Sequence, residues 1–328
     1  MVLFIWWPPF VCGNPCYHDC DDHSLQVNPR CYKCGAITYC LYFLYGTNID
    51  TCDGVANIDP FFETWISSDL KIFQGPYIVF KPKYGFWGVK NYWAPEVYEY
   101  HGRYYMFASF KGGIGQNRGT AVLVSNNPEG PFIEYSCGPV TLKKHECLDG
   151  TLYIDKDKQP WVIFCHEWTE IYYGKVIASR LSEDLSRSIG GDNITIVDTK
   201  TDYIPWIRQV HDQRVRKEGF LTDAPFIHEL SDGKLLMLWS SYSKQGEDGT
   251  GGGYVIAGVI SETGKIQGPW KHLNQLIMDR NIGHSALFRT FDGRLKLISH
   301  CNDTEHGCEH PVIFDVVETD TSISIYEG

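Results

Sequence analysis

The sequence predicts an all-β fold, a five-bladed β-propeller, because two short phrases recur along its 328 residues. The first phrase is Gly-Pro-aromatic, and its copies begin at Gly75, Gly130 and Gly268, 55 and then 138 residues apart. The second is a polar turn before an apolar strand, and it occurs at 101–103, 156–158, 232–234 and 292–294, with a less regular copy at 34–35. Five strand-and-turn units of roughly 55–75 residues are typical of a propeller, whose ring closure removes long exposed sheet edges.

The blades follow in chain order from runs of β-branched and aromatic residues between turns. The expected blades are 34–82, 92–142, 147–200, 220–272 and 281–327. Residues 1–26 are expected to form an irregular, Cys-rich segment, and residues 27–328 the propeller domain. The polar stretch 200–219 is predicted to be a functional loop. No segment keeps a 3.6-residue apolar period for three turns, so no substantial helix is expected.

Composition excludes two classes of partner. The formal net charge is −11 and there is no basic run, which argues against a nucleic-acid surface. No apolar stretch reaches 18 residues, so no membrane span is expected. Ten Trp and twenty Tyr suit the apolar faces of sugars, although strands also use aromatic residues for packing. A monomer is expected.

Seven of the twelve cysteines fall within the first 52 residues. A zinc cluster could be built from Cys16, His18, Cys20, His23, Cys31 and Cys34. Disulfides or buried thiols are the simpler interpretation, and Cys301 and Cys308 could also form a disulfide across a short polar loop. Asn193 and Asn302 are N-glycosylation acceptors if the protein is secreted. The apolar start lacks a basic region and resembles a signal peptide poorly. A secreted location is expected, with the cytoplasm as the alternative.

Acidic residues at the starts or ends of inner strands are the strongest chemical signal. They are Glu96, Asp149, Glu167 and Asp223. Equivalent strand starts converge on one channel mouth in a propeller, and two or three facing carboxylates are what glycoside hydrolysis requires. One carboxyl must donate a proton, another must activate water, and a third can tune the first by like-charge repulsion. A single Asp before a strand is, by contrast, usually a turn or cap.

His284 begins the inner strand of the last expected blade, where it could face the central axis. A lone His is more often a core residue than a ligand, and a metal on the axis would change that balance.

Four ordered motifs, one per blade, carry a family resemblance. They are Asn91–Val97 (NYWAPEV), Leu148–Gly150 (LDG), Thr222–Phe226 (TDAPF) and Gly283-His284. Together they resemble glycoside hydrolase family 43, the arabinofuranosidase, xylosidase and arabinanase group, over about residues 27–326. The resemblance implies a five-bladed propeller, inverting hydrolysis of furanosides or xylosides in oligosaccharide or polysaccharide side chains, and a structural calcium ion in the channel.

The resemblance also implies roles for individual residues. Asp149 matches the family's pKa-tuning Asp. Asp223 stands where the family usually has its acid Glu, so either the shorter Asp is the acid or Glu167 takes that role. His284 matches the axial His and is the candidate metal contact. Trp93 matches an aromatic residue of the sugar pocket, and the other candidate substrate-binding residues are Glu96 and Arg118.

The general base departs from the family pattern. The family places Arg-Asp-Pro before its first Tyr-Leu-Tyr-Gly strand, whereas Arg30 is followed here by Cys31. The resemblance therefore predicts that Cys31 occupies the position of the base Asp. Asp59, in a similar phrase, comes after that strand, and the other stand-ins are Asp19, Asp21 and Asp22.

The expected function is hydrolysis of terminal α-L-arabinofuranosyl or β-D-xylosyl linkages with inversion, through an acid and base carboxylate pair. A thiol is a poor base, so the alternative is a carbohydrate-binding propeller with weak or lost hydrolysis. A protein-interaction scaffold is a third class, whose channel mouth would not need to collect carboxylates.

Overall fold

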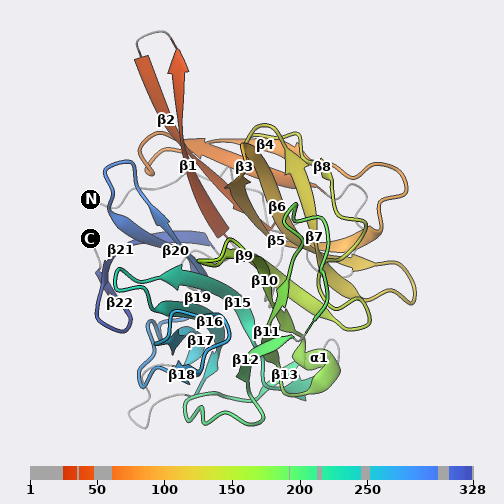
Figure 1. The fold of residues 1–328 in the computed structure, drawn as a ribbon, viewed down its shortest axis with the longest axis vertical. Coiled ribbons are helices and arrows are strands. Elements are labelled where there is room, and N and C mark those ends of the chain that lie inside the picture. The colour runs from red at the N-terminus through yellow and green to blue at the C-terminus, as the bar shows by residue number, and fades with distance from the viewer. Residues whose placement is uncertain are drawn as a thin grey trace, which may run out of the picture.

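A computed structural model describes residues 25–34, 37–47, 61–191, 193–212, 216–244, 252–301 and 310–326. Five four-stranded antiparallel sheets form the blades of a propeller, each made of strands consecutive in the chain (Figure 1). The first blade comprises β1 (Leu25–Cys34), β2 (Ile37–Gly46), β3 (Phe62–Ser67) and β4 (Gln74–Phe80). The second comprises β5 (Gly88–Tyr100), β6 (Arg103–Gly112), β7 (Arg118–Ser125) and β8 (Ile133–Glu134).

The other three blades have the same plan. The third comprises β9 (Cys147–Ile154), β10 (Pro160–His166), β11 (Lys175–Arg180) and β12 (Ile194–Asp198). The fourth comprises β15 (Asp223–Glu229), β16 (Leu235–Ser243), β17 (Gly253–Ser261) and β18 (Trp270–His272). The fifth comprises β19 (Ile282–Arg289), β20 (Leu295–Cys301), β21 (His310–Glu318) and β22 (Ile323–Tyr326). The prediction of an all-β, five-bladed propeller is confirmed.

Both repeated phrases have fixed places in the blade. Each polar turn joins the first and second strands of its blade, as between β5 and β6. The Gly-Pro phrases lie at the fourth strand of three blades, and their peptide bonds Gly75-Pro76, Gly130-Pro131 and Gly268-Pro269 are all cis. The repeat therefore marks equivalent points of successive blades.

Two stretches differ from the expected elements. The first blade begins at Leu25 instead of near residue 34, because β1 obtains its strand structure by pairing with β2 and not from an apolar pattern of its own. The polar insertion 200–219 contains a two-stranded sheet of β13 (Val210–Asp212) and β14 (Lys217–Gly219). The one helix among the described residues is the single turn α1 (Trp168–Ile171).

Five clusters of buried side chains fill the five interfaces between blades. Representative pairs, from the first interface to the ring closure, are Phe62 with Phe110, Phe107 with Phe164, Trp161 with Trp239, Leu238 with Leu297, and Leu44 with Ile298. Each side chain of this size contributes about 1.5–3 kcal/mol when it is fully buried. The last pair joins β2 to β20, so packing between the first and last blades closes the ring.

The first strands of blades two to five share a one-residue bulge. In each, the pairing with the second strand shifts register around a residue with positive φ. These residues are Ala94 (52°), Asp149 (55°), Ala224 (51°) and His284 (51°). A bulge re-aims side chains, and positive φ is costly for residues other than glycine, so its recurrence indicates a functional edge. We call the end of the propeller that carries these bulges the mouth.

Candidate active site

Asp149 is the bulge residue of β9 and is hydrogen-bonded to two neighbouring blades. Its backbone N–H donates to Ser109 Oγ of the second blade at 2.8 Å. Its Oδ2 accepts the backbone N–H of Ala224, the bulge residue of the fourth blade, at 3.0 Å. Only 4% of Asp149 is exposed. The carboxylate is thus fixed at the junction of three blades.

Asp223 immediately precedes Ala224 and is also buried. Tyr254 Oη donates to Asp223 Oδ2 at 3.1 Å, and the Tyr254 ring stacks on His300 with centroids 5.4 Å apart. The Asp149 carboxylate therefore lies against the backbone of the residue that follows Asp223. The two aspartates are not equivalent within their blades, because Asp149 is a bulge residue and Asp223 is the residue before one.

Glu96 is held two residues beyond the bulge of β5. Its Oε2 accepts hydrogen bonds from the hydroxyls of Tyr98 and Thr151, the latter at 2.8 Å. Burial raises the pKa of Glu96 to about 7, and the nearby charge of Asp149 adds to that rise. Near neutral pH Glu96 is therefore partly protonated, beside Asp149.

Trp93, Arg118 and Glu167 form a second group next to the first. Arg118 Nη1 donates to Glu167 Oε2 at 2.5 Å, and the guanidinium lies over the Trp93 ring, 4.2 Å from its centroid. Trp93 pairs with Ser109, whose hydroxyl accepts the Asp149 N–H. Glu167, the N-cap residue of α1, is therefore ion-paired with Arg118. This pair holds the guanidinium over the face of the Trp93 ring.

His284 is 3% exposed and lies beside Asp149, with Nδ1 4.0 Å from Asp149 Oδ2. The His300 ring is a further neighbour, with its centroid 6.3 Å away. Calcium prefers about six to eight oxygen ligands. The Asp149 carboxylate and the two imidazoles named here offer too few oxygen donors to coordinate calcium by themselves. An ion held mainly through waters stays a prediction, tested by the effect of a chelator on stability.

The prediction that Cys31 occupies the base position at the mouth is wrong. Cys31 pairs with Cys40, six residues along β1 from Leu25, which pairs with Gly46. Thr47, the next residue, contacts the mouth, because its Oγ1 accepts the Ala94 N–H at 3.0 Å. At about 3.3 Å per residue, Cys31 is about 20 Å further along the hairpin.

Arg30 confirms this register. It forms an ion pair of 3.9 Å with Glu99 and lies over the Tyr104 ring at 4.6 Å, and both partners belong to the far ends of β5 and β6. In Figure 1 the β1–β2 hairpin projects past the rest of the propeller. The other base candidates, Asp59, Asp19, Asp21 and Asp22, lie outside the described residues.

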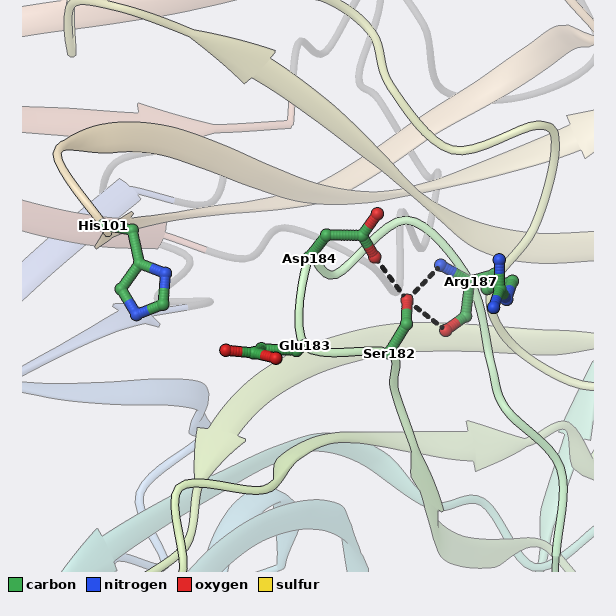
Figure 2. A pocket seen from close by; sticks show the side chains of 5 residues that line it. All are labelled: His101, Ser182, Glu183, Asp184 and Arg187. Carbon is green, nitrogen blue, oxygen red and sulfur yellow. Dashed lines mark hydrogen bonds between the residues drawn. The ribbon is translucent and has the colours of Figure 1, made fainter.

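A surface pocket lies at the other end of the second and third blades. Figure 2 shows its lining, in which His101 of the β5–β6 turn faces the loop Ser182–Arg187. Ser182 Oγ donates to Asp184 Oδ1 at 2.6 Å and holds that loop together. None of the candidate site residues lines this pocket, so it is separate from the mouth.

Sequence reasoning missed the hydroxyls that connect the blades at the mouth. Ser109 accepts the Asp149 N–H, Ser240 accepts the His284 N–H at 2.9 Å, and Thr47 accepts the Ala94 N–H. The signal was present, since residues 106–109 (MFAS) and 237–240 (MLWS) place a serine at the same point of two second strands. Aligning the blades on these strands would have found them.

Comparison with known proteins assigns the family. The model for glycosyl hydrolases family 43 matches residues 38–312. No sequence among the curated proteins matches the chain. A solved endo-arabinase from Bacteroides thetaiotaomicron is 35% identical, with a TM-score of 0.75, over 90% of this chain and 95% of that one.

Two more distant structures share the fold. A thermostable family-43 glycoside hydrolase is 20% identical, with a TM-score of 0.70, over 93% of this chain and 94% of that one. An α-L-arabinanase from Cellvibrio cellulosa, complexed with arabinohexaose, is 16% identical, with a TM-score of 0.60, over 93% and 95%. Among the described residues no helix is long and apolar enough to cross a membrane. The chain belongs to glycoside hydrolase family 43.

Proposed function

We propose that this protein hydrolyses arabinofuranosyl linkages of arabinan with inversion of configuration. The observation that carries the proposal is that two buried carboxylates lie on neighbouring blades, with Asp149 hydrogen-bonded to the backbone of Ala224, the residue after Asp223. The 35% identity to an endo-arabinase favours internal linkages over the terminal ones that the sequence suggested. Terminal arabinofuranosyl and xylosyl linkages are the alternatives that the experiment below separates.

In the proposed mechanism Asp223 donates a proton to the leaving oxygen. Asp149 disfavours loss of that proton through like-charge repulsion. Its carboxylate is held close by the N–H of Ala224, the residue that follows Asp223. The residues that precede β1 supply the base, and Asp21 and Asp22 lie four and three residues before its first residue, Leu25. A water activated on the face opposite the leaving group gives the inverted product.

Trp93 and Arg118 are proposed to bind the sugar. An aromatic face suits the apolar side of a sugar ring, and a guanidinium can donate several hydrogen bonds to hydroxyls. Glu167 fixes Arg118 in this mechanism, and the proton donor is Asp223. The alternative of a propeller that binds without hydrolysis loses its main support, because Cys31 is not at the mouth.

The test uses linear arabinan, a nitrophenyl α-L-arabinofuranoside and a nitrophenyl β-D-xyloside, with NMR detection of the first anomer released. We expect turnover of arabinan with inversion, and losses of about 10²–10⁴-fold in kcat for Asp149→Asn and Asp223→Asn. Asp157→Asn, in the exposed β9–β10 turn, is the matched control. Binding of arabinan without turnover by the unmodified protein would support the binding module instead.

A secreted location is part of the proposal. Cys40 is disulfide-bonded, and disulfides persist mainly in oxidising compartments. The side chains of Cys16, Cys20, Cys31, Cys34 and Cys308, which the sequence offers for disulfides or zinc, lie outside the described part of the chain. Detection of the protein in culture supernatant, with Cys40 resistant to alkylation, would test this location.

A further inference from the structure

His145, His166 and Glu170 bring three metal-ligating side chains together outside the carboxylate site. Their ligand atoms all lie within 4.8 Å of one another, and they are the only such group of three or more among the described residues. The Glu170 carboxylate spans the two rings. Oε1 lies 3.2 Å from His145 Nδ1, and Oε2 lies 2.8 Å from His166 Nε2.

Three separate pieces of structure supply these ligands. His145 comes from the loop before β9, His166 ends β10, and Glu170 is in α1. The two imidazole rings face each other at a tilt, with centroids 4.7 Å apart. His166 is 10% exposed, whereas His145 is 45% and Glu170 31% exposed. The group thus has one buried anchor and an open side on which water could complete a coordination shell.

The Glu170 carboxylate supplies the negative charge of the group. Glu146 and Glu167 flank it in sequence, but each is paired with a cation, Glu146 with Lys111 and Glu167 with Arg118. The Glu146 N–H donates to Glu170 Oε2 at 2.8 Å, which orients the carboxylate toward the two rings. A backbone hydrogen bond of this kind is how metal-ligating carboxylates are held in place.

We propose that His145, His166 and Glu170 bind a divalent transition metal ion, for which Zn²⁺ is the probe. Two imidazoles and one carboxylate, with water in the remaining position, form a zinc donor set. The ion would lie between the ring nitrogens and the Glu170 carboxylate, in place of the present hydrogen bonds. It would join the loop before β9 to α1, and so brace Glu167, whose N–H donates to the Glu146 carbonyl at 2.9 Å. This inference does not depend on the substrate of the mouth.

The test measures Zn²⁺ binding to chelator-treated full-length protein by calorimetry, and its thermal stability with and without Zn²⁺. We expect Zn²⁺ to raise Tm by a few degrees, since a ligand that binds only the folded state stabilises it. His145→Ala and Glu170→Gln should each lower the Zn²⁺ affinity of one site by at least ~10-fold. His211→Ala is the matched control, because His211 has only Glu218 beside it, at 3.9 Å.

The cysteines of the first 52 residues could bind Zn²⁺ independently, so Co²⁺ spectra separate the two sources. Nitrogen and oxygen ligands give weak visible bands without the intense near-ultraviolet absorption of thiolate ligation. A Co²⁺ spectrum free of thiolate bands that is lost in Glu170→Gln would support the site. Unchanged Zn²⁺ affinity and Tm response in both His145→Ala and Glu170→Gln would overturn it.

Discussion

The first strands of blades two to five differ from that of blade one. The former shift register at a residue with positive φ, whereas β1 pairs with β2 without interruption from Leu25 to Cys34. Each bulge presents a backbone N–H to a neighbouring blade, as at Ala94, Asp149 and His284. β1, which has no bulge, instead places Arg30 away from the mouth, beside Glu99 and over the Tyr104 ring.

This difference teaches where the chemistry of each blade lies. A bulge turns a side chain out of the alternating pattern and toward the mouth. Blade three uses this position for Asp149, and blade four uses the preceding residue for Asp223. Among its described residues, blade one meets the neighbouring bulge through Thr47 at the end of β2, so the mouth end of β1 is Leu25.

The largest effect should come from the residues that enter the straight strand. We predict that Asp21→Asn or Asp22→Asn lowers kcat on arabinan by about 10²–10⁴-fold, because the general base is lost. Cys31→Asp should leave kcat unchanged, since Cys31 is about 20 Å from the mouth. A rate increase in Cys31→Asp would show that the register of β1 has been misassigned. A loss of kcat in Asp59→Asn, with none in Asp21→Asn or Asp22→Asn, would place the base after β2.

A second prediction concerns the pH dependence of stability caused by Glu96. Its pKa is about 7 in the folded protein, against an ordinary value of 4.5. Between these values the unfolded chain has lost a proton that the folded protein retains, so stability falls as pH rises and levels off above pH 7. The fall should total about 3 kcal/mol.

Glu96→Gln tests this because an amide can still accept from Tyr98 and Thr151 but does not titrate. We expect the Tm of Glu96→Gln minus the Tm of the unmodified protein to increase from pH 5 to pH 8. The exposed Glu183→Gln serves as control. Parallel Tm curves for Glu96→Gln and the unmodified protein would mean that Glu96 is ionised throughout this range.

A third prediction tests the group beside the bulge of blade two. Arg118→Lys should lower kcat/KM by about 10-fold, mainly through KM, because an ammonium cannot both pair with Glu167 and cover the Trp93 ring in the same way. Steady-state kinetics on arabinan measures the effect, with Arg187→Lys in the remote pocket as control. A pure kcat loss would assign Arg118 to the chemical step instead of sugar binding.

The smallest effect should come from the hydroxyls that receive the bulge N–H groups. Ser240→Ala leaves the buried His284 N–H without its acceptor and should lower the free energy of unfolding by about 1–3 kcal/mol in urea titration. Thr47→Val removes the corresponding acceptor at the junction with blade one. Similar losses of unfolding free energy in Thr47→Val and Ser240→Ala would show that the junction between blades one and two is built like that between blades four and five. Ser186→Ala, in a surface loop, is the control.

The sequence by itself determined the number of blades and the order of the motifs. Polar turns and Gly-Pro phrases determine the local backbone conformation. Because every blade needs the same turns, their regular spacing is visible in the sequence. Blades three to five were therefore located to within three residues, although blade two begins four residues and ends eight residues earlier than predicted. Asp149, Asp223, Trp93 and His284 were found on first strands.

Only the tertiary structure decided which of these residues meet. The offset between Asp149 and Asp223, the ion pair of Arg118 with Glu167 and the raised pKa of Glu96 all depend on contacts between blades. The register of β1 depends on its partner, because its own sequence has no apolar alternation to fix which residue faces which. The pairing places Cys31 six residues from the mouth end of β1, in the far part of the hairpin, and the composition of the strand does not reveal this.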